Sequence, residues 1–176
     1  FVGVGVCAAV APTGLDRLTQ WLSDGYAGEM AYFERRRPAY EHPSNVLPGV
    51  RAIVMLATSY LTTVPQTTPI GHGRVSRYAW SGFDYHDLLH DRTSELGLFV
   101  KRELNAVHFR AVVDTAPLLE REFAQLAGLG WQGKNTLLLN KSLGSWFFLS
   151  ALLLDVELEY DQPFSTDHCG TCTACL

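Results

Sequence analysis

The sequence has few cysteines, no long apolar run and no excess of positive charge, and each shortage excludes a class of protein. Four cysteines among 176 residues are too few for a small disulfide-stapled domain. No stretch approaches the roughly 20 apolar residues that a membrane helix needs, and no secretory signal opens the chain. A net charge of -4 argues against a surface built mainly to hold nucleic acid backbone. We therefore expect a soluble, cytoplasmic protein with no membrane partner.

Strand-like and helical stretches alternate along the chain, whose length predicts about one domain. Apolar and β-branched runs predict strands at 1–6, 52–60, 109–114, 136–139 and 146–154. Helical spacing of apolar residues predicts helices over 15–22 and 85–104, and a third that begins at Pro117 and ends at Gly128. Residues 30–48, rich in Arg, Pro and Tyr, are expected to form a loop. The alternation predicts a layered α/β fold.

Three of the cysteines lie within the last eight residues, because Cys169, Cys172 and Cys175 form a CxxCxxC pattern. This pattern opens the bacterial ferredoxin motif, in which closely spaced thiolates hold the irons of one cubane cluster. Zinc is the alternative, although paired CxxC zinc sites usually lie about a dozen or more residues apart. The fourth Cys and the Pro of the ferredoxin motif are missing, so three ligands do not complete a cluster. Cys7 is expected to be a buried apolar side chain.

A glycine-rich segment, 128–135, matches the phosphate-loop pattern GxxxxGK but has Asn135 where that loop carries Ser or Thr. A helix is expected before it and a strand after it, which reverses the order of a true phosphate loop and argues against nucleotide hydrolysis. Lys134 and Asn135 remain candidates for gripping another polar ligand. The alternative is a helix C-cap followed by an exposed lysine.

Asp114 ends the third strand candidate and precedes a helix. The carboxyl ends of strands in open α/β sheets face the ligand crevice, so a carboxylate there is well placed for chemistry. The apolar residues 111–113 are expected to favour its protonated form, which could then donate a proton. The alternative is a helix N-cap, and the spacing alone does not decide between them.

An ordered set of segments resembles the epoxyqueuosine reductase family of tRNA-modifying enzymes. In chain order these segments are GYAGEMAY, LPGVR, SRYAWSGFDYH, DTAPLLER, AGLGWQGKN, LGSWFFL and CGTCTACL. Together they span nearly the whole chain, and the ordered set is more specific than any one segment.

The resemblance implies a cobalamin-dependent reductase with two [4Fe-4S] clusters that converts epoxyqueuosine to queuosine at the wobble position of tRNA. It implies a cobalamin-binding domain related to that of reductive dehalogenases over 1–164, with helices layered on a mixed sheet, and the start of a ferredoxin-like domain over 165–176. Electrons would pass from the clusters to the cobalt while Asp114 protonates the epoxide oxygen. The implied partners are the modified tRNA and an electron donor. We expect a monomer, and a piece of a longer protein that is inactive alone.

Cobalamin presents amides, a phosphate tail and a flat corrin, so its site should combine small residues, backbone N–H groups and apolar or aromatic walls. The residues expected to supply these are Arg37, Tyr78, Asp84, Tyr85, His86, Lys134, Asn135, Gly144 and Ser145. His86 is expected to form hydrogen bonds rather than to ligate cobalt, because the chain lacks a DxHxxG pattern. Tyr78, Trp80 and Tyr85 either stack on an extruded anticodon base or pack in the core.

Two functions of other classes fit parts of the sequence. One is an electron-transfer ferredoxin module, for which the ~170 residues before the cysteines are too many. The other is a zinc-stapled, noncatalytic RNA-binding domain, which the net charge of -4 disfavours.

Overall fold

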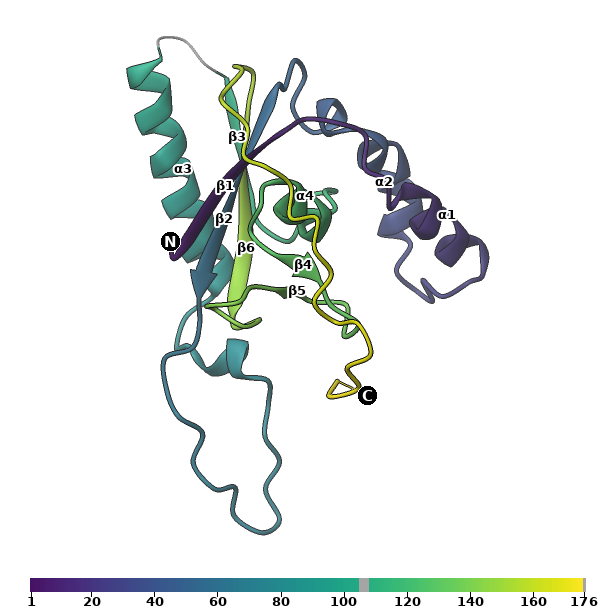
Figure 1. Cartoon of the computed structure of the whole chain (residues 1–176), viewed down its shortest axis with the longest axis vertical. Coiled ribbons are helices and arrows are strands. Elements are labelled where there is room, and N and C mark those ends of the chain that lie inside the picture. Colours follow the sequence, from purple (N-terminus) through teal and green to yellow (C-terminus); the bar gives the residue numbers. More distant parts are fainter. Residues whose placement is uncertain (105–107, 176) are drawn as a thin grey trace.

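A four-stranded sheet forms the centre of the computed structural model, which describes residues 1–104 and 108–175 (Figure 1). The strands, in the order in which they lie, are β1 (Gly3–Ala8), β2 (Ala52–Ser59), β6 (Phe147–Leu154) and β3 (Phe109–Val112). Every neighbouring pair is antiparallel. The α/β fold class is confirmed, but the mixed sheet is wrong for the described strands. Near-continuous apolar strands mark burial on both faces, which helices can provide for an antiparallel sheet as well as for a mixed one.

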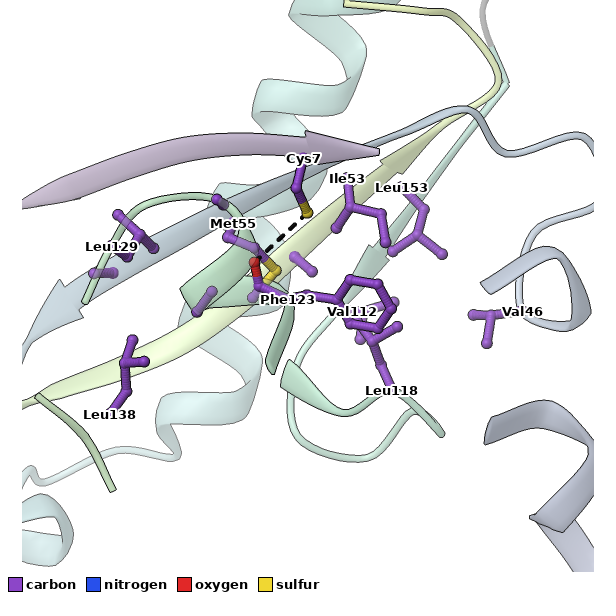
Figure 2. Close-up of a cluster of buried hydrophobic side chains, with 14 of the residues drawn as sticks. Cys7, Val46, Ile53, Met55, Val112, Leu118, Phe123, Leu129, Leu138 and Leu153 are labelled. Atoms are coloured by element: carbon purple, nitrogen blue, oxygen red, sulfur yellow. Dashed lines mark hydrogen bonds between the residues drawn. The ribbon is translucent and has the colours of Figure 1, made fainter. Parts of the chain in front are cut away.

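Helices cover both faces of this sheet (Figure 1). On one face, α3 (Tyr85–Glu103) packs Leu96 and Val100 against buried leucines of β2 and β6. On the other face, Phe123 of α4 (Glu120–Leu126) is 1% exposed and packs against the other side chains of β2 and β6 (Figure 2). Burying one such phenyl ring contributes about 2–3 kcal/mol. The two cores hold the carboxyl end of β3, where Asp114 follows, in a fixed position.

Cys7 belongs to the core around Phe123, as predicted. Its side chain is 4% exposed, and its Sγ donates to the backbone carbonyl oxygen of Phe123 at 3.5 Å (Figure 2). Burial raises the pKa of this thiol to about 12. Cys7 is therefore a structural side chain and not a ligand.

The segment 30–48, expected to be a loop, contains the helix α2 (Tyr32–Glu41) and the 3-10 turn Pro43–Asn45. Pro38 lies inside α2 and was the reason for expecting a loop. Phe33 of α2 packs edge-on against Trp21 of α1 (Leu15–Ser23), with the ring centroids 5.4 Å apart. This contact between helices outweighs the local cost of the proline, and the expectation of a loop is wrong.

The glycine-rich segment lies after α4 and forms a hairpin of β4 (Trp131–Gln132) and β5 (Leu138–Leu139). A Cβ at Gly130 would lie 2.0 Å from the carbonyl oxygen of Leu139, so only glycine permits this close approach. The expected strand at 136–139 is shorter than predicted, because Thr136 turns with φ at 67°. The observed order of helix then hairpin confirms that this is not the strand-to-helix context of a phosphate loop.

The chain after β6 returns along β1 and α4 (Figure 1). The backbone N–H of Asp161 donates to the carbonyl oxygen of Val6 at 2.9 Å, and that of Phe164 donates to the carbonyl oxygen of Gln125 at 2.9 Å. These bonds bring the cysteine segment to the β4–β5 hairpin; of the expected second domain, Leu176 lies outside the described residues. Within 1–104 and 108–175, no helix is long and apolar enough to cross a bilayer.

Candidate active site at the edge of the sheet

Asp114 lies where the chain leaves the carboxyl end of β3, in a left-handed backbone conformation with φ at 49°. Its side chain is 63% exposed, so the expected apolar setting is wrong. The apolar side chains of Val112 and Val113 point into the core, while the turn directs the carboxylate outward. The N-cap alternative is also wrong, because α4 begins at Glu120, six residues later.

Three side chains from the start of α3 surround the Asp114 carboxylate. The hydroxyl of Tyr85 donates to Asp114 Oδ2 at 2.9 Å, and Nε2 of His86 lies 3.3 Å from the same oxygen. The other ring nitrogen of His86, Nδ1, lies 2.8 Å from Asp84 Oδ1. Asp84 also accepts the backbone N–H of His86 at 2.9 Å and so caps α3. Both nitrogens of His86 therefore face carboxylates, which agrees with a hydrogen-bonding role rather than with cobalt ligation.

The charges of this cluster are arranged around His86. Desolvation alone would lower the pKa of His86, but its hydrogen bonds to Asp84 and Asp114 outweigh desolvation and raise that pKa above its ordinary value. Burial, followed by the hydrogen bond to Asp114, raises the pKa of Tyr85, so Tyr85 stays a hydrogen-bond donor at neutral pH. The hydrogen bonds from the backbone and ring of His86 lower the pKa of Asp84. The cluster can thus hold a proton beside Asp114.

A cavity of about 430 Å³ opens beside Asp114. Its walls are largely aromatic or apolar and come from β6, from the hairpin and from the loops around α3; among the residues that line it are Tyr60, Tyr78, Tyr85, Glu120, Ser145 and Phe148. Tyr85 stacks on Phe148 with the rings 4.1 Å apart and on His86 at 4.0 Å, which favours the packing alternative for this tyrosine. Tyr78 is 46% exposed and lies edge-on to Tyr85. The cavity combines flat walls with two carboxyl groups.

Two buried polar atoms close to this cavity have no partner among the residues that the structure describes. They are Oγ1 of Thr58 and Nε of Arg77, which both belong to side chains lining an adjoining hollow of about 280 Å³. Arg77 begins a 3-10 turn, Arg77–Trp80, and its guanidinium lies 4.3 Å from the ring centroid of Trp146. A ligand with amide groups and a flat face would satisfy such atoms. Neither residue was singled out from the sequence, because their burial depends on the fold.

A larger cavity of about 910 Å³ lies on the other side of the Asp114 loop and is lined by Arg36, His86, His90, Arg110 and Thr115, among others. Arg36 donates from Nη1 to the carbonyl oxygen of Thr115 at 2.7 Å and so holds the residue next to Asp114. Arg37, the expected cofactor contact, instead lies 3.8 Å from Glu34 on α2 and lines neither cavity.

The four expected contacts from the glycine-rich segments separate in the structure. Ser145 lines the cavity, and its carbonyl oxygen accepts the hydroxyl of Tyr60 at 3.3 Å. Gly144 closes the turn before β6 through backbone bonds with Asn140. The side-chain oxygen of Asn135 accepts the backbone N–H of Leu137 at 3.2 Å, inside the hairpin turn.

Lys134 points to the cysteine segment instead. Its Nζ donates to the carbonyl oxygens of Gly170 and Cys172 at 2.6 and 3.1 Å. Trp131, on the same hairpin, donates from Nε1 to Sγ of Cys169 at 3.4 Å and stacks on Phe164 at 5.6 Å. The hairpin also lines the Asp114 cavity through Leu137 and Leu138, so one element contacts both the cavity and the cysteines.

All three cysteines of the CxxCxxC segment are free thiols. The backbone N–H of Cys172 donates to the carbonyl oxygen of Cys169 at 2.8 Å, which forms the expected tight turn. Within the described part of the chain, no three His, Cys, Asp or Glu side chains converge as a metal site would require. The segment therefore presents thiol donors on a held turn without a finished ligand shell.

Comparison with known proteins places these features in a family. Residues 41–115 match the family described as "Epoxyqueuosine reductase QueG, DUF1730". The epoxyqueuosine reductase of Cyclobacterium marinum is 38% identical over 179 residues, which cover 99% of this chain and 57% of that protein. The chain spans about half the length of the curated relatives that it matches.

Solved structures agree in fold. A crystal structure of selenomethionine-labelled epoxyqueuosine reductase is similar with a TM-score of 0.86 and 30% identity, over 99% of this chain and 47% of that chain. A crystal structure of epoxyqueuosine reductase with an epoxyqueuosine-modified tRNA-Tyr stem loop is similar with a TM-score of 0.82 and 28% identity, over 99% and 46% of the two chains.

Proposed function

Because this chain belongs to the epoxyqueuosine reductase family, we propose that it forms the half of such an enzyme in which epoxyqueuosine in tRNA is reduced to queuosine. The observation that carries the proposal is the Asp114 carboxylate, held by Tyr85 and His86 at the mouth of an aromatic cavity. The substrate would be the modified base of a tRNA, since one solved relative is complexed with an epoxyqueuosine-modified stem loop. An external electron donor completes the set of partners.

Asp114 is proposed as the proton donor to the epoxide oxygen. Opening an epoxide leaves an alkoxide, which is a strong base and needs a proton from a group within hydrogen-bond reach. Asp114 meets this need because its side chain is exposed toward ligand and its Oδ2 lies 3.3 Å from a histidine with a raised pKa. His86 can return a proton to Asp114 after each transfer, and Tyr85 keeps the carboxylate aimed.

The residues around the cavity fit cobalamin. The unpartnered polar atoms of Thr58 and Arg77 suit the amide groups around a corrin, and the rings of Tyr78 and Phe148 provide flat apolar walls. Ser145 is retained as a contact from the cavity wall. Cobalamin, when bound, would supply the low-valent cobalt that transfers electrons to the epoxide. The chain's own part is to hold the corrin, exclude water and deliver the proton.

The cysteine segment is proposed to supply three ligands of a [4Fe-4S] cluster, which would carry the electrons. Three free thiols in a CxxCxxC turn have the donor chemistry for iron, and Trp131 and Lys134 hold the turn against the hairpin. A fourth ligand is left to another part of the protein. We accordingly propose that 1–164 is the cobalamin-binding domain and that 165–176 begins the ferredoxin-like one.

The test replaces Asp114→Asn in the full-length protein, with Asp91→Asn at an exposed position on α3 as the matched control. Asparagine keeps the shape but cannot protonate the oxygen, so queuosine formation should fall by at least about 10²-fold. The corrin absorbance that remains with the protein after desalting should match the wild type. Turnover near the wild-type rate in the Asp114→Asn protein would refute the assignment.

A further inference from the structure

Reduction of an epoxide to an alkene consumes two protons, and this requirement extends the proposed function, on which the inference rests. Both carbon–oxygen bonds break, one carbon–carbon π bond forms, and the oxygen leaves as water. Two electrons enter from the low-potential donor, and two protons must reach the same oxygen. Asp114 carries one proton per turnover, so a second acid is needed in the same cavity.

Glu120 is the other carboxylic acid on the wall of that cavity. It is the first residue of α4, and its Oε1 is buried with no hydrogen-bond partner among the described residues. Glu122, two residues later, differs, because its two oxygens accept the backbone N–H groups of Thr13 and Gly14 at the start of α1. Glu122 thus has a structural role, whereas Glu120 has an unsatisfied oxygen at a ligand cavity, a costly arrangement in a purely structural residue.

The groups that face Glu120 leave it protonated at neutral pH. Burial raises the pKa of Glu120 to about 8 against the opposing effect of its own backbone N–H, and the Asp114 charge raises it further. Arg121 lowers this pKa, but its guanidinium donates to the carbonyl oxygen of Thr136 on the hairpin turn rather than to Glu120. Tyr40 of α2 also faces Glu120; burial raises the pKa of Tyr40, and the Glu120 charge raises it further.

We propose that Glu120 is the second proton donor of the reaction. Asp114 protonates the oxygen as the first carbon–oxygen bond breaks, which gives a hydroxyl group. Glu120 protonates that hydroxyl as the second bond breaks, so that the oxygen leaves as water and the alkene forms. The exposed Asp114 is then reprotonated through His86 or from solvent, and Glu120 takes its proton from water that enters after product release.

The test compares the wild type with Glu120→Gln, Glu120→Asp and the exposed control Glu95→Gln in the reconstituted full-length enzyme, with epoxyqueuosine-modified tRNA as substrate. Glutamine keeps the size of protonated Glu120 but cannot give a proton, so kcat should fall by about 10²-fold or more. Glu120→Asp should recover part of the rate, and Glu95→Gln should match the wild type. The wild-type rate should fall above about pH 8, and this decline should be absent from the residual rate of Glu120→Gln.

The outcomes separate this inference from the function on which it rests. Wild-type enzyme that makes no queuosine would contradict the proposed function itself. Active wild type together with an equally active Glu120→Gln would overturn only the role of Glu120, as would a wild-type decline above pH 8 that Glu120→Gln keeps. If instead His86→Gln removes that decline while Glu120→Gln retains it, the second proton comes from His86, and the proposal is wrong.

Discussion

The protonation of Glu120 makes a prediction that needs neither substrate nor cofactor. The folded protein raises the pKa of Glu120 from 4.5 to about 8, so the folded state binds this proton more tightly than the unfolded state does. The resulting stabilisation is fully present below pH 4.5 and is lost as the pH rises through 8. Each pH unit between these limits costs about 1.4 kcal/mol, and the loss reaches about 3 kcal/mol at pH 7. Glu120→Gln does not titrate and escapes this loss.

The assay is urea unfolding of this chain at pH 5, 6, 7 and 8, followed by tryptophan fluorescence. The free energy of unfolding of Glu120→Gln should exceed that of the wild type by an amount that grows with pH and reaches roughly 2–3 kcal/mol at pH 7. Glu95→Gln, on the exposed side of α3, should differ from the wild type by less than about 0.5 kcal/mol at every pH. A difference between Glu120→Gln and the wild type that does not change with pH would refute the reasoning.

Two further changes test how the frame is held. Trp131→Phe keeps a ring beside Phe164 but removes the N–H that Cys169 accepts, so alkylation of Cys169 by iodoacetamide should become several-fold faster relative to Cys172, as measured by peptide mass spectrometry; an unchanged ratio would contradict the contact. Gly5→Ala would place a Cβ 2.0 Å from the carbonyl oxygen of Ala127, where backbone must shift, so the free energy of unfolding should fall by about 2 kcal/mol or more. Gly3→Ala, with its nearest contacts at 3.4 Å, should be much milder, and equal losses in the two variants would disprove the packing of α4 on β1.

The sequence predicts the strands well because their apolar runs are set by burial alone. Burial on both faces does not reveal strand direction, however, and the antiparallel pairing of β2 with β6 follows from chain connections that span about half the molecule. The helix α2 could not be predicted from local rules, since Pro38 argues against a helix and the packing of Phe33 on Trp21 decides in its favour.

The candidate site was predictable only where position along a strand limits the chemistry. Asp114 follows β3, so its place at the sheet edge follows from sequence, whereas its exposure depends on a left-handed turn that the sequence does not reveal. Glu120 and Glu122 look alike in sequence. The fold alone directs one toward the cavity and the other toward the start of α1.

The most direct test of the account is the nucleoside content of tRNA from cells that lack the full-length enzyme and receive it back as wild type or as Asp114→Asn. The account predicts queuosine with the wild type, and epoxyqueuosine without queuosine when Asp114→Asn is present at the same protein level. Queuosine at wild-type abundance in the Asp114→Asn cells would contradict the claim that the Asp114 cavity carries out the reduction.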